Sequence, residues 1–315
     1  MKHYSVMCNE IIDSLNIKSN GIYVDATLGY AGMSSKILEK LDKKGLLIGI
    51  DQDIEAREYS DKVLKQIGGN YKIIDANFCD LKKKLEELNI TKIDGIIFDL
   101  GFSSPQIDDE KRGFSFMKDA ELDMRMNLDS KLTAKIVVNT YKENDLVNCF
   151  YEYGEEKMSK LIARKIVDVR KNKEITTTLE LVEIIKSAVG ANYFFKTHPE
   201  RKIFQALRIL VNNELEVIKK ALPDAIELLN KGGRLSVISF HSLEDRIVKN
   251  IFKEYSEVDP IFKGLPEIPK EYQAKIKLIN KKPILASEEE LKENSRSHSA
   301  KLRIIERVWY NEKRK

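Results

Sequence analysis

The sequence predicts an α/β protein in which a mostly parallel sheet is interrupted by an all-helical insertion. Over the first hundred residues, short apolar runs alternate with amphipathic stretches of about ten residues, as in a parallel sheet covered on both faces. Residues 134–229 carry only helical periodicity, and an apolar run at residues 233–240 resumes the sheet. We therefore expect a sheet domain at residues 1–106 and 213–315, and an inserted helical domain at residues 107–212.

The individual elements follow from local patterns. Apolar runs bounded by glycine or polar residues predict strands at residues 21–25, 46–51, 71–74 and 93–99. Apolar residues at helical spacing predict the intervening helices at residues 32–41, 54–67 and 81–88. Residues 101–132 show little periodicity, and a loop of that length is typically functional. The later elements are expected as helices at residues 134–141, 144–153, 157–170, 179–189, from 200 onward and at 243–255, and as strands at residues 233–240, 275–280 and 301–307.

Composition and charge exclude several classes of protein. Of the 315 residues, 42% are apolar and 33% are charged, which excludes a disordered chain and a membrane protein. The formal net charge of +4 is too small to indicate a nucleic-acid partner by itself. Residues 270–315 hold 13 basic and 7 acidic residues. This basic end hints at a polyanionic partner, although on charge alone a lysine-rich solvated surface is the stronger alternative.

The cysteines and the hydropathy indicate the compartment. Cys8, Cys79 and Cys149 are odd in number and scattered, without the spacing of a disulfide framework or a zinc site. No apolar run approaches the ~20 residues of a membrane span, and the first residues lack the apolar core of a signal peptide. We expect a cytoplasmic protein with neither a metal ion nor a membrane as partner.

The loop after the first strand has the composition of a ligand-binding turn. Gly29 and Gly32 precede a helix, where glycine lets a ligand approach the backbone and the helix N-terminus attracts anionic groups. The dinucleotide fingerprint G-x-G-x-x-G is missing. Asp51 ends the second strand, where an acid commonly binds ribose hydroxyls; it is alternatively a helix N-cap, a role that Asp53 also suits. The pattern favours a nucleoside-bearing cofactor without a pyrophosphate, such as S-adenosylmethionine, over a turn without a ligand.

A second loop follows the fourth strand. Asp99 ends this strand, which is expected beside the first, at the switch point where open α/β sheets bind ligands. Neutral donors and acceptors with one rigid proline come next: Ser103, Ser104, Pro105 and Gln106. Arg112, Phe114 and Arg125 then form an arginine–aromatic mixture that suits phosphate contact and base stacking or, alternatively, an apolar lid. No histidine or cysteine lies nearby in the sequence, so hydrolase triads and covalent cysteine chemistry gain no support.

Several long motifs, in order along nearly the whole chain, carry a family resemblance. They are His3–Met7 with Glu10, Tyr23–Gly29, Asp99–Gly101 with Ser103–Gln106, Arg112–Met117, Leu122–Met126, His198–Pro199 with Phe204–Ile209, Ser239–Arg246 and Ser299–Arg303. On these motifs the chain resembles the bacterial small-subunit ribosomal RNA cytosine-N4 methyltransferase family, the RsmH or MraW type.

The resemblance implies a Rossmann-like class I methyltransferase fold with a doubly wound sheet. It also implies an enzyme that uses S-adenosylmethionine to methylate the exocyclic N4 amine of a cytidine in small-subunit (16S) ribosomal RNA. Carried over by position, the cofactor contacts are Ala31, Gly32, Met33, Asp51, Phe78, Asp99 and Gln106. The family usually has Gly-Gly-His at residues 31–33, so a histidine side-chain role is lost here, whereas a contact made by the backbone tolerates Ala31 and Met33. The expected partner is 16S ribosomal RNA or the small ribosomal subunit, and a homodimer is left open.

The chemistry requires alignment of amine, methyl carbon and sulfur, helped by acceptors around the amine. We hypothesise that four residues supply this: Asp99, Ser103, Ser104 and Pro105. Asp99 alternatively only holds the cofactor. RNA contacts are expected on the inserted helices and the loops, from basic residues and one aromatic residue: Arg112, Phe114, Arg125, His198, Arg201, Arg208, His241, Lys301 and Arg303. For His198 and His241 the alternative is structural hydrogen bonding.

The helix expected from residue 200 onward carries a polar stripe beside an apolar stripe. Its polar members suit RNA contact or, alternatively, plain surface charge: Arg201, Gln205, Arg208 and Asn212. The neighbouring apolar stripe is expected in the core: Phe204, Leu207, Val211, Leu215 and Ile218.

Two other functions stay open on the sequence alone. One is a methyltransferase that acts on a small amine or on a protein side chain. The other is a non-catalytic RNA-binding ribosome-assembly factor that retains the methyltransferase fold, for which Met33 is the main argument.

Overall fold

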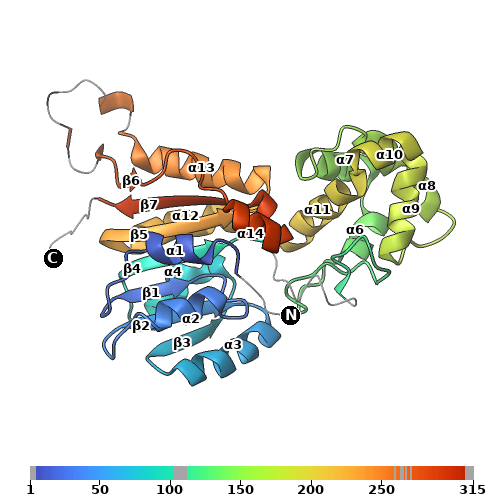
Figure 1. The fold of residues 1–315 in the computed structure, drawn as a ribbon. Helices are drawn as coiled ribbons and strands as arrows, with labels where there is room; N and C mark the ends of the chain where they lie inside the picture. Colours follow the sequence, from blue (N-terminus) through green and yellow to red (C-terminus); the bar gives the residue numbers. More distant parts are fainter. Residues whose placement is uncertain are drawn as a thin grey trace. The chain divides into compact units, whose positions relative to one another are not determined.

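The structure, a computed structural model, describes residues 5–101, 112–258, 260–262, 266, 268–269 and 272–308. The chain divides into two compact units (Figure 1). Met1–Gly101 and Leu215–Lys315 form the first, called the sheet unit, and Phe102–Glu214 form the second, called the helical unit. The insertion expected at residues 107–212 starts five residues later and ends two residues earlier than this helical unit.

In the described part of the chain, seven strands form one sheet in the order β3-β2-β1-β4-β5-β7-β6. They are β1 (Ile22–Asp25), β2 (Leu46–Asp51), β3 (Tyr71–Asp75), β4 (Ile93–Asp99), β5 (Leu229–Ser239), β6 (Ile276–Leu278) and β7 (Lys301–Arg307). Strands β1 to β5 pair in parallel, and β7 runs antiparallel between β5 and β6. The predicted α/β class is therefore confirmed, and the order of the strands reverses between β1 and β4.

Strand β5 differs from the expected strand. It begins at Leu229 rather than at residue 233, and its pairing with β4 jumps from Ile93 opposite Leu229 to Gly95 opposite Arg234. Gly232, with a φ of 77°, lies among the extra residues. An irregularity of this kind interrupts the period-two pattern on which a strand prediction depends.

Helices cover both faces of the sheet. Those of the sheet unit are α1 (Cys8–Ser14), α2 (Gly32–Leu38), α3 (Ile54–Ile67), α4 (Leu81–Glu87), α12 (Glu214–Leu228, whose first residue belongs to the helical unit), α13 (Ser242–Ser256) and α14 (Glu288–Glu293), with short 3-10 turns η1 (Phe78–Asp80), η3 (Pro260–Phe262) and η5 (Ser295–Ser299). One apolar cluster includes Phe98 from β4 and Phe252 from α13, and a second includes Ile97 from β4 and Ile37 from α2. Because Ile97 and Phe98 are successive strand residues, the two clusters lie on opposite faces.

The helical unit has a core of its own. Its helices are α6 (Ala134–Thr140), α7 (Glu143–Glu152), α8 (Ser159–Arg170), α9 (Thr178–Val189), α10 (Ala191–Thr197) and α11 (Pro199–Asn212). The predicted core residues Phe204, Leu207 and Val211 are buried in this cluster, which confirms that part of the apolar stripe.

The long helix expected from residue 200 onward is in fact two helices. Helix α11 ends at Asn212 and α12 begins at Glu214, because Asn213 adopts a left-handed φ of 52°. Asparagine tolerates this conformation better than most residues. Ile218, expected on one stripe with Phe204, instead packs in the cluster of the sheet unit.

Candidate active site

Each of four parallel strands ends in an aspartate. Asp25, Asp51, Asp75 and Asp99 are the last residues of β1, β2, β3 and β4. The carboxyl ends of parallel strands meet at one edge, called the carboxyl edge below, where open α/β sheets bind their ligands. Sequence reasoning singles out Asp51 and Asp99 but misses Asp25, although the same signal marks it: an acid that closes a buried strand.

The loop between β1 and α2 turns tightly at this edge. Gly29 and Ala31 adopt left-handed φ angles of 50° and 61°. The Gly29 amide donates to Asp51 Oδ2 at 2.9 Å. A Cβ added to Gly29 would have its nearest neighbour 3.8 Å away, whereas a Cβ added to Gly32 would lie 2.0 Å from Ser5 Oγ. Gly29 therefore leaves room beside the carboxyl edge, and Gly32 permits close packing.

Asp51 is held by backbone donors. Its Oδ2 accepts from Gly29, and its Oδ1 accepts from the Asp53 amide at 2.8 Å. Burial raises the pKa of Asp51, and these two hydrogen bonds oppose the rise. Asp53 Oδ1 accepts from the Glu55 amide at 3.0 Å and is the N-cap of α3. The helix-cap alternative for Asp51 is therefore wrong, because Asp53 fills that role.

Asp25 and Asp99 lie on neighbouring strands and are linked through Thr27. Asp25 accepts from Ser34 Oγ at 2.7 Å and from the Thr27 amide at 3.2 Å, and burial raises its pKa to about 6. The Asp99 amide donates to Thr27 Oγ1 at 2.7 Å. Asp99 Oδ1 is shielded from solvent and has no hydrogen-bond partner among the described residues. Burial and the charges of Asp25 and Glu244 raise the pKa of Asp99 to about 8.

The other expected cofactor residues are placed in different ways. Ala31 and Met33 are buried in the apolar cluster that includes α1 and α2, so the Met33 side chain fills core and only its backbone remains for a ligand. Phe78 is half-buried and packs edge-on against Phe98, with ring centroids 5.5 Å apart. Four predicted residues lie outside the described part of the chain: Ser103, Ser104, Pro105 and Gln106.

The polar stripe on α11 forms hydrogen bonds inside the helical unit. Gln205 donates to the Tyr153 carbonyl at 2.9 Å. Arg208 donates to both carboxylate oxygens of Glu214, at 2.8 and 2.9 Å. Asn212 donates to the carbonyl of Met124 at 2.8 Å and accepts from the amide of Met126 at 2.7 Å. These members of the stripe tie α11 to its surroundings.

The arginines of the long loop form hydrogen bonds with other residues of the same loop. Arg112 is buried and donates to the carbonyls of Arg125 and Met126 at 2.9 and 3.1 Å. Arg125 pairs with Asp123 through two hydrogen bonds of 2.8 and 2.7 Å and also donates to the Leu128 and Ser130 carbonyls. Phe114 is half-buried against the helical core. The direct RNA role expected of these three residues stays a prediction.

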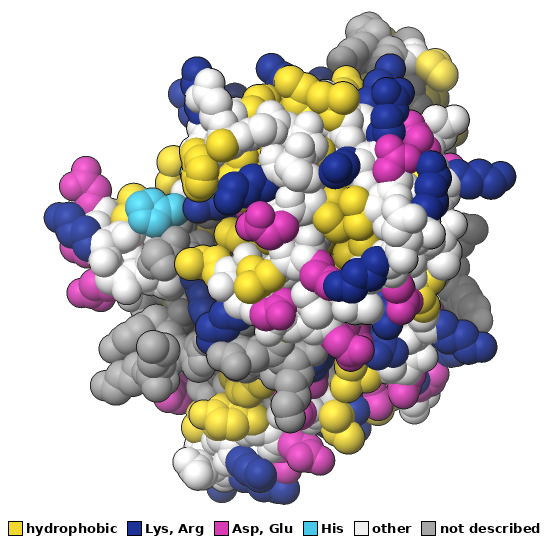
Figure 2. All heavy atoms as spheres, turned by 90° about the vertical axis from the view of Figure 1, so that its right-hand side faces the viewer, with side chains coloured by type: hydrophobic (Ala, Val, Ile, Leu, Met, Phe, Trp, Pro, Cys, Tyr) yellow, Lys and Arg dark blue, Asp and Glu magenta, His cyan; other side chains and the backbone are white. Residues whose placement is uncertain are grey.

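His198 and Arg201 reach the surface at the start of α11. The His198 side chain is 46% exposed, and its Nδ1 lies 3.0 Å from Oε1 of the buried Glu200. Arg201 is exposed, with its guanidinium carbon 5.9 Å from the centroid of the Phe116 ring. The face drawn in Figure 2 carries basic side chains among apolar and acidic ones.

The predicted RNA contacts of the sheet unit gather around α13. His241 is the N-cap of α13 and shares a capping box with Glu244. Arg303 donates to both oxygens of Asp245 at 2.7 and 3.1 Å, and Lys301 Nζ lies 3.8 Å from the same carboxylate. Burial works against the charged form of Asp245, but the bonds from Arg303 hold its pKa below the usual value. Lys301 is the more exposed of the two basic residues.

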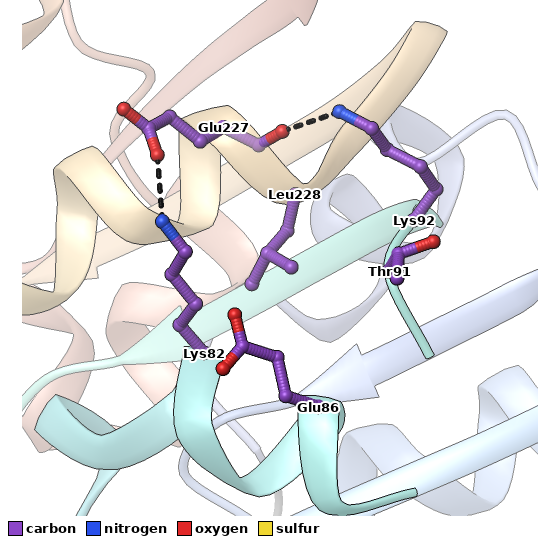
Figure 3. Close-up of a pocket in the computed structure, with 6 residues that line it drawn as sticks. All are labelled: Lys82, Glu86, Thr91, Lys92, Glu227 and Leu228. Carbon is purple, nitrogen blue, oxygen red and sulfur yellow. Dashed lines mark hydrogen bonds and ion pairs between the residues drawn. The ribbon is translucent and has the colours of Figure 1, made fainter. Parts of the chain in front are cut away.

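A pocket of about 200 Å³ opens at the opposite edge of the sheet (Figure 3). It is lined by Lys82, Glu86, Thr91, Lys92, Glu227 and Leu228, which stand near the starts of β4 and β5. Lys82 Nζ lies 3.0 Å from Glu227 Oε2, and Lys92 Nζ donates to the Glu227 carbonyl at 2.8 Å. Ligand pockets typically measure about 300–1,000 Å³. This pocket is smaller than that and lies at the amino ends of β4 and β5 rather than at the carboxyl edge.

Among the described residues, no helix has both the length and the apolar character needed to cross a membrane. The strand order, the single antiparallel strand β7, and the acids that close β1, β2 and β4 beside a glycine loop define a Rossmann-like protein of the class I methyltransferase type. The chain belongs to the MraW methylase family, whose model matches residues 1–308. This confirms the resemblance carried by the sequence motifs.

Individual proteins are similar to this chain over nearly its whole length. A Streptococcus mutans protein named ribosomal RNA small subunit methyltransferase H is 52% identical over 309 residues, 97% of this chain and 98% of that protein. A solved structure of a putative rRNA methylase from Clostridium thermocellum is 12% identical, with a TM-score of 0.46 over 97% of this chain and all of that one. A putative methyltransferase from S. mutans in complex with SAH is 12% identical, with a TM-score of 0.44 over the same shares. The fold assignment rests on this chain's own strand order.

Proposed function

We propose that the protein methylates the exocyclic N4 amine of a cytidine in the 16S RNA of the small ribosomal subunit, in the cytoplasm, with S-adenosylmethionine as methyl donor. The methylase family and the 52% identical ribosomal RNA methyltransferase support this function. The structural observation that carries it is the carboxyl edge, where Asp25, Asp51 and Asp99 surround a glycine loop with open space at Gly29.

The residues at this edge fit a cationic nucleoside. The carboxylate of Asp51 has lone pairs beyond those used by Gly29 and Asp53, and these suit ribose hydroxyls. Asp99 Oδ1 has no donor among the described residues, so a positive group beside it would be stabilised. Met33 does not disturb this fit, because its side chain packs in the core. Met33 therefore does not favour a non-catalytic assembly factor over an enzyme.

The methyl group of S-adenosylmethionine is already activated, which leaves alignment as the main task of the protein. Orientation of the reactants contributes about 7–11 kcal/mol in favourable cases. We assign Asp99 as the acceptor nearest the amine, since its side chain has an unused oxygen at the carboxyl edge. Ser103, Ser104 and Pro105 are expected to add neutral acceptors.

We assign RNA recognition to the helical unit and to strand β7 of the sheet unit. His198, Arg201 and Lys301 keep exposed cationic or hydrogen-bonding groups and are the proposed direct contacts. Arg112, Arg125, Arg208 and Arg303 are proposed to act indirectly, by holding the segments that carry the contacts. Phe114 and His241 stay predicted contacts without a further argument, and so does a homodimer.

The function is tested by nucleoside mass spectrometry of ribosomal RNA from cells with and without this protein. We expect N4-methylcytidine from the small subunit to disappear without it and to return with the wild-type chain. Asp99→Ala should fail to restore it, whereas Asp75→Ala, which changes the exposed aspartate of β3, should restore it. An unchanged modification level in cells that lack the protein would refute the proposal. Purified enzyme with labelled donor then separates naked RNA, assembled subunits and small amines as substrates.

The catalytic assignment is tested on purified variants. Cofactor affinity and the single-turnover rate are measured for Asp99→Ala and Ser104→Ala. A slower transfer at saturating cofactor supports the acceptor role, and a loss of cofactor affinity alone supports the alternative that Asp99 only holds the cofactor. Unchanged transfer in both variants would refute the assignment of these residues.

A further inference from the structure

Three aspartates at the carboxyl edge differ in how their oxygens are bonded. Both oxygens of Asp25 accept hydrogen bonds, from Thr27 and Ser34. Both oxygens of Asp51 also accept hydrogen bonds, from backbone amides. Asp99 differs, because its Oδ1 is shielded from solvent and has no donor among the described residues, whereas its backbone amide donates to Thr27. Among the described residues, hydrogen-bond donors therefore reach both oxygens of Asp25 and of Asp51, but none reaches Oδ1 of Asp99.

The charged groups around Asp99 make its ionised form more costly still. Asp25 on β1 and Glu244 on α13 act on it with like charge, and the Cys8 thiol on α1 also interacts with it. Among the described residues, none of the groups that shift the pKa of Asp99 is a cation. A buried carboxyl in such surroundings retains its proton at neutral pH unless a positive charge arrives. Burial and these like charges together raise the pKa of Asp99 to about 8.

We propose that Asp99 holds a proton until S-adenosylmethionine binds and then releases it, so that the protein exchanges a proton for the positive sulfur. This inference rests on the proposed function for the identity of the cofactor. It adds that binding of the methyl donor is coupled to proton release, and that the coupling depends on the charge of the sulfur.

The same carboxyl then balances charge during methyl transfer. The amine nitrogen forms a bond to the methyl carbon, and the carbon–sulfur bond breaks with its electron pair left on sulfur. The amine passes one proton to Asp99 Oδ1, so the sulfur and the carboxyl become neutral in the same turnover. The product, with a neutral sulfur, then faces an uncharged Asp99. Because of this proton transfer, ionised Asp99 stabilises the positively charged donor before the reaction, and neutral Asp99 faces the neutral product after it.

Calorimetry of wild-type protein tests the coupling without any turnover. Binding of S-adenosylmethionine and of S-adenosylhomocysteine is measured at pH 7 in buffers with different ionisation enthalpies. With a pKa of about 8, Asp99 is about nine-tenths protonated at pH 7, so we expect the donor to release close to one proton more than the product. Both compounds carry the same amino-acid group, so the difference reports only the charge on sulfur. Equal proton release by the two compounds would overturn the inference.

Two variants locate the proton. Asp99→Asn should abolish the difference in proton release between the two compounds. Asp75→Asn makes the same change at the end of β3, where the side chain is exposed and paired with Arg57, and should retain the difference. If the difference persists in Asp99→Asn, another group is the source and the assignment is wrong.

The pH dependence provides an independent check. Affinity for the donor relative to the product should rise about tenfold per pH unit below pH 8 and level off above it, because ionisation of Asp99 then costs nothing further. A pH-independent ratio between pH 6 and 8 would contradict the coupling. If S-adenosylmethionine does not bind at all, the proposed function itself fails; if it binds without extra proton release, only this inference fails.

Discussion

Replacing Arg208 by methionine should destabilise the helical unit rather than act on RNA alone. Arg208 donates to both oxygens of Glu214, and the two side chains are only 11% and 8% exposed. Methionine keeps much of the side-chain length but leaves Glu214 without these two donors. Removal of one partner from a buried ion pair costs about 3–5 kcal/mol. Because this pair is slightly exposed, we expect the free energy of unfolding to fall by about 3 kcal/mol.

The assay is urea unfolding of the Arg208→Met variant, followed by RNA affinity measured well below the unfolding transition. Arg201→Met is the matched control, because Arg201 is an exposed residue of the same helix whose contact with Phe116 is worth about 0.5–1 kcal/mol. The control should keep nearly wild-type stability, bind RNA more weakly and lower the salt slope of binding by about 0.7. The reasoning is refuted if Arg208→Met unfolds at the wild-type urea concentration, or if Arg201→Met is the less stable of the two.

Three further changes test other parts of the structure. Asp53→Ala removes the N-cap of α3 and should cost about 1 kcal/mol, seen as a lower urea midpoint. Met33→His places an imidazole in an apolar site that is 4% exposed and should cost about 1–3 kcal/mol in the same assay, without a gain in cofactor affinity. Asp25 has its pKa raised by burial to about 6, so its contribution to stability is greatest below about pH 4 and is lost as pH rises to about 6, by roughly 2–3 kcal/mol. Asp25→Asn should flatten the stability profile in this range; a profile with the wild-type slope would show that another group titrates.

The strands and most helices could be predicted because their patterns are local. β2 and β4 occupy the residues that their apolar runs predict, and α3 begins and ends as its spacing predicts. Errors arose where a single backbone angle overrides the pattern. Asn213 ends α11 although the apolar spacing continues, and the extra residues around Gly232 hide the start of β5. Side-chain periodicity carries no information about either left-handed residue.

Some residues of the candidate site could likewise be predicted from the sequence, and others could not, for a physical reason. The strand-final aspartates could be predicted to share a place, because parallel topology forces the carboxyl ends of strands to one edge whatever their side chains do. The roles of the basic residues could not be predicted from spacing, since tertiary structure determines which carboxylate a long flexible side chain contacts. Arg208 and Arg201 lie on one helix with the same side chain, yet Arg208 pairs with Glu214 across a helix break, whereas Arg201 stays exposed. Helical spacing assigns a residue to a face, but the nearest carboxylate decides whether its charge is available to RNA.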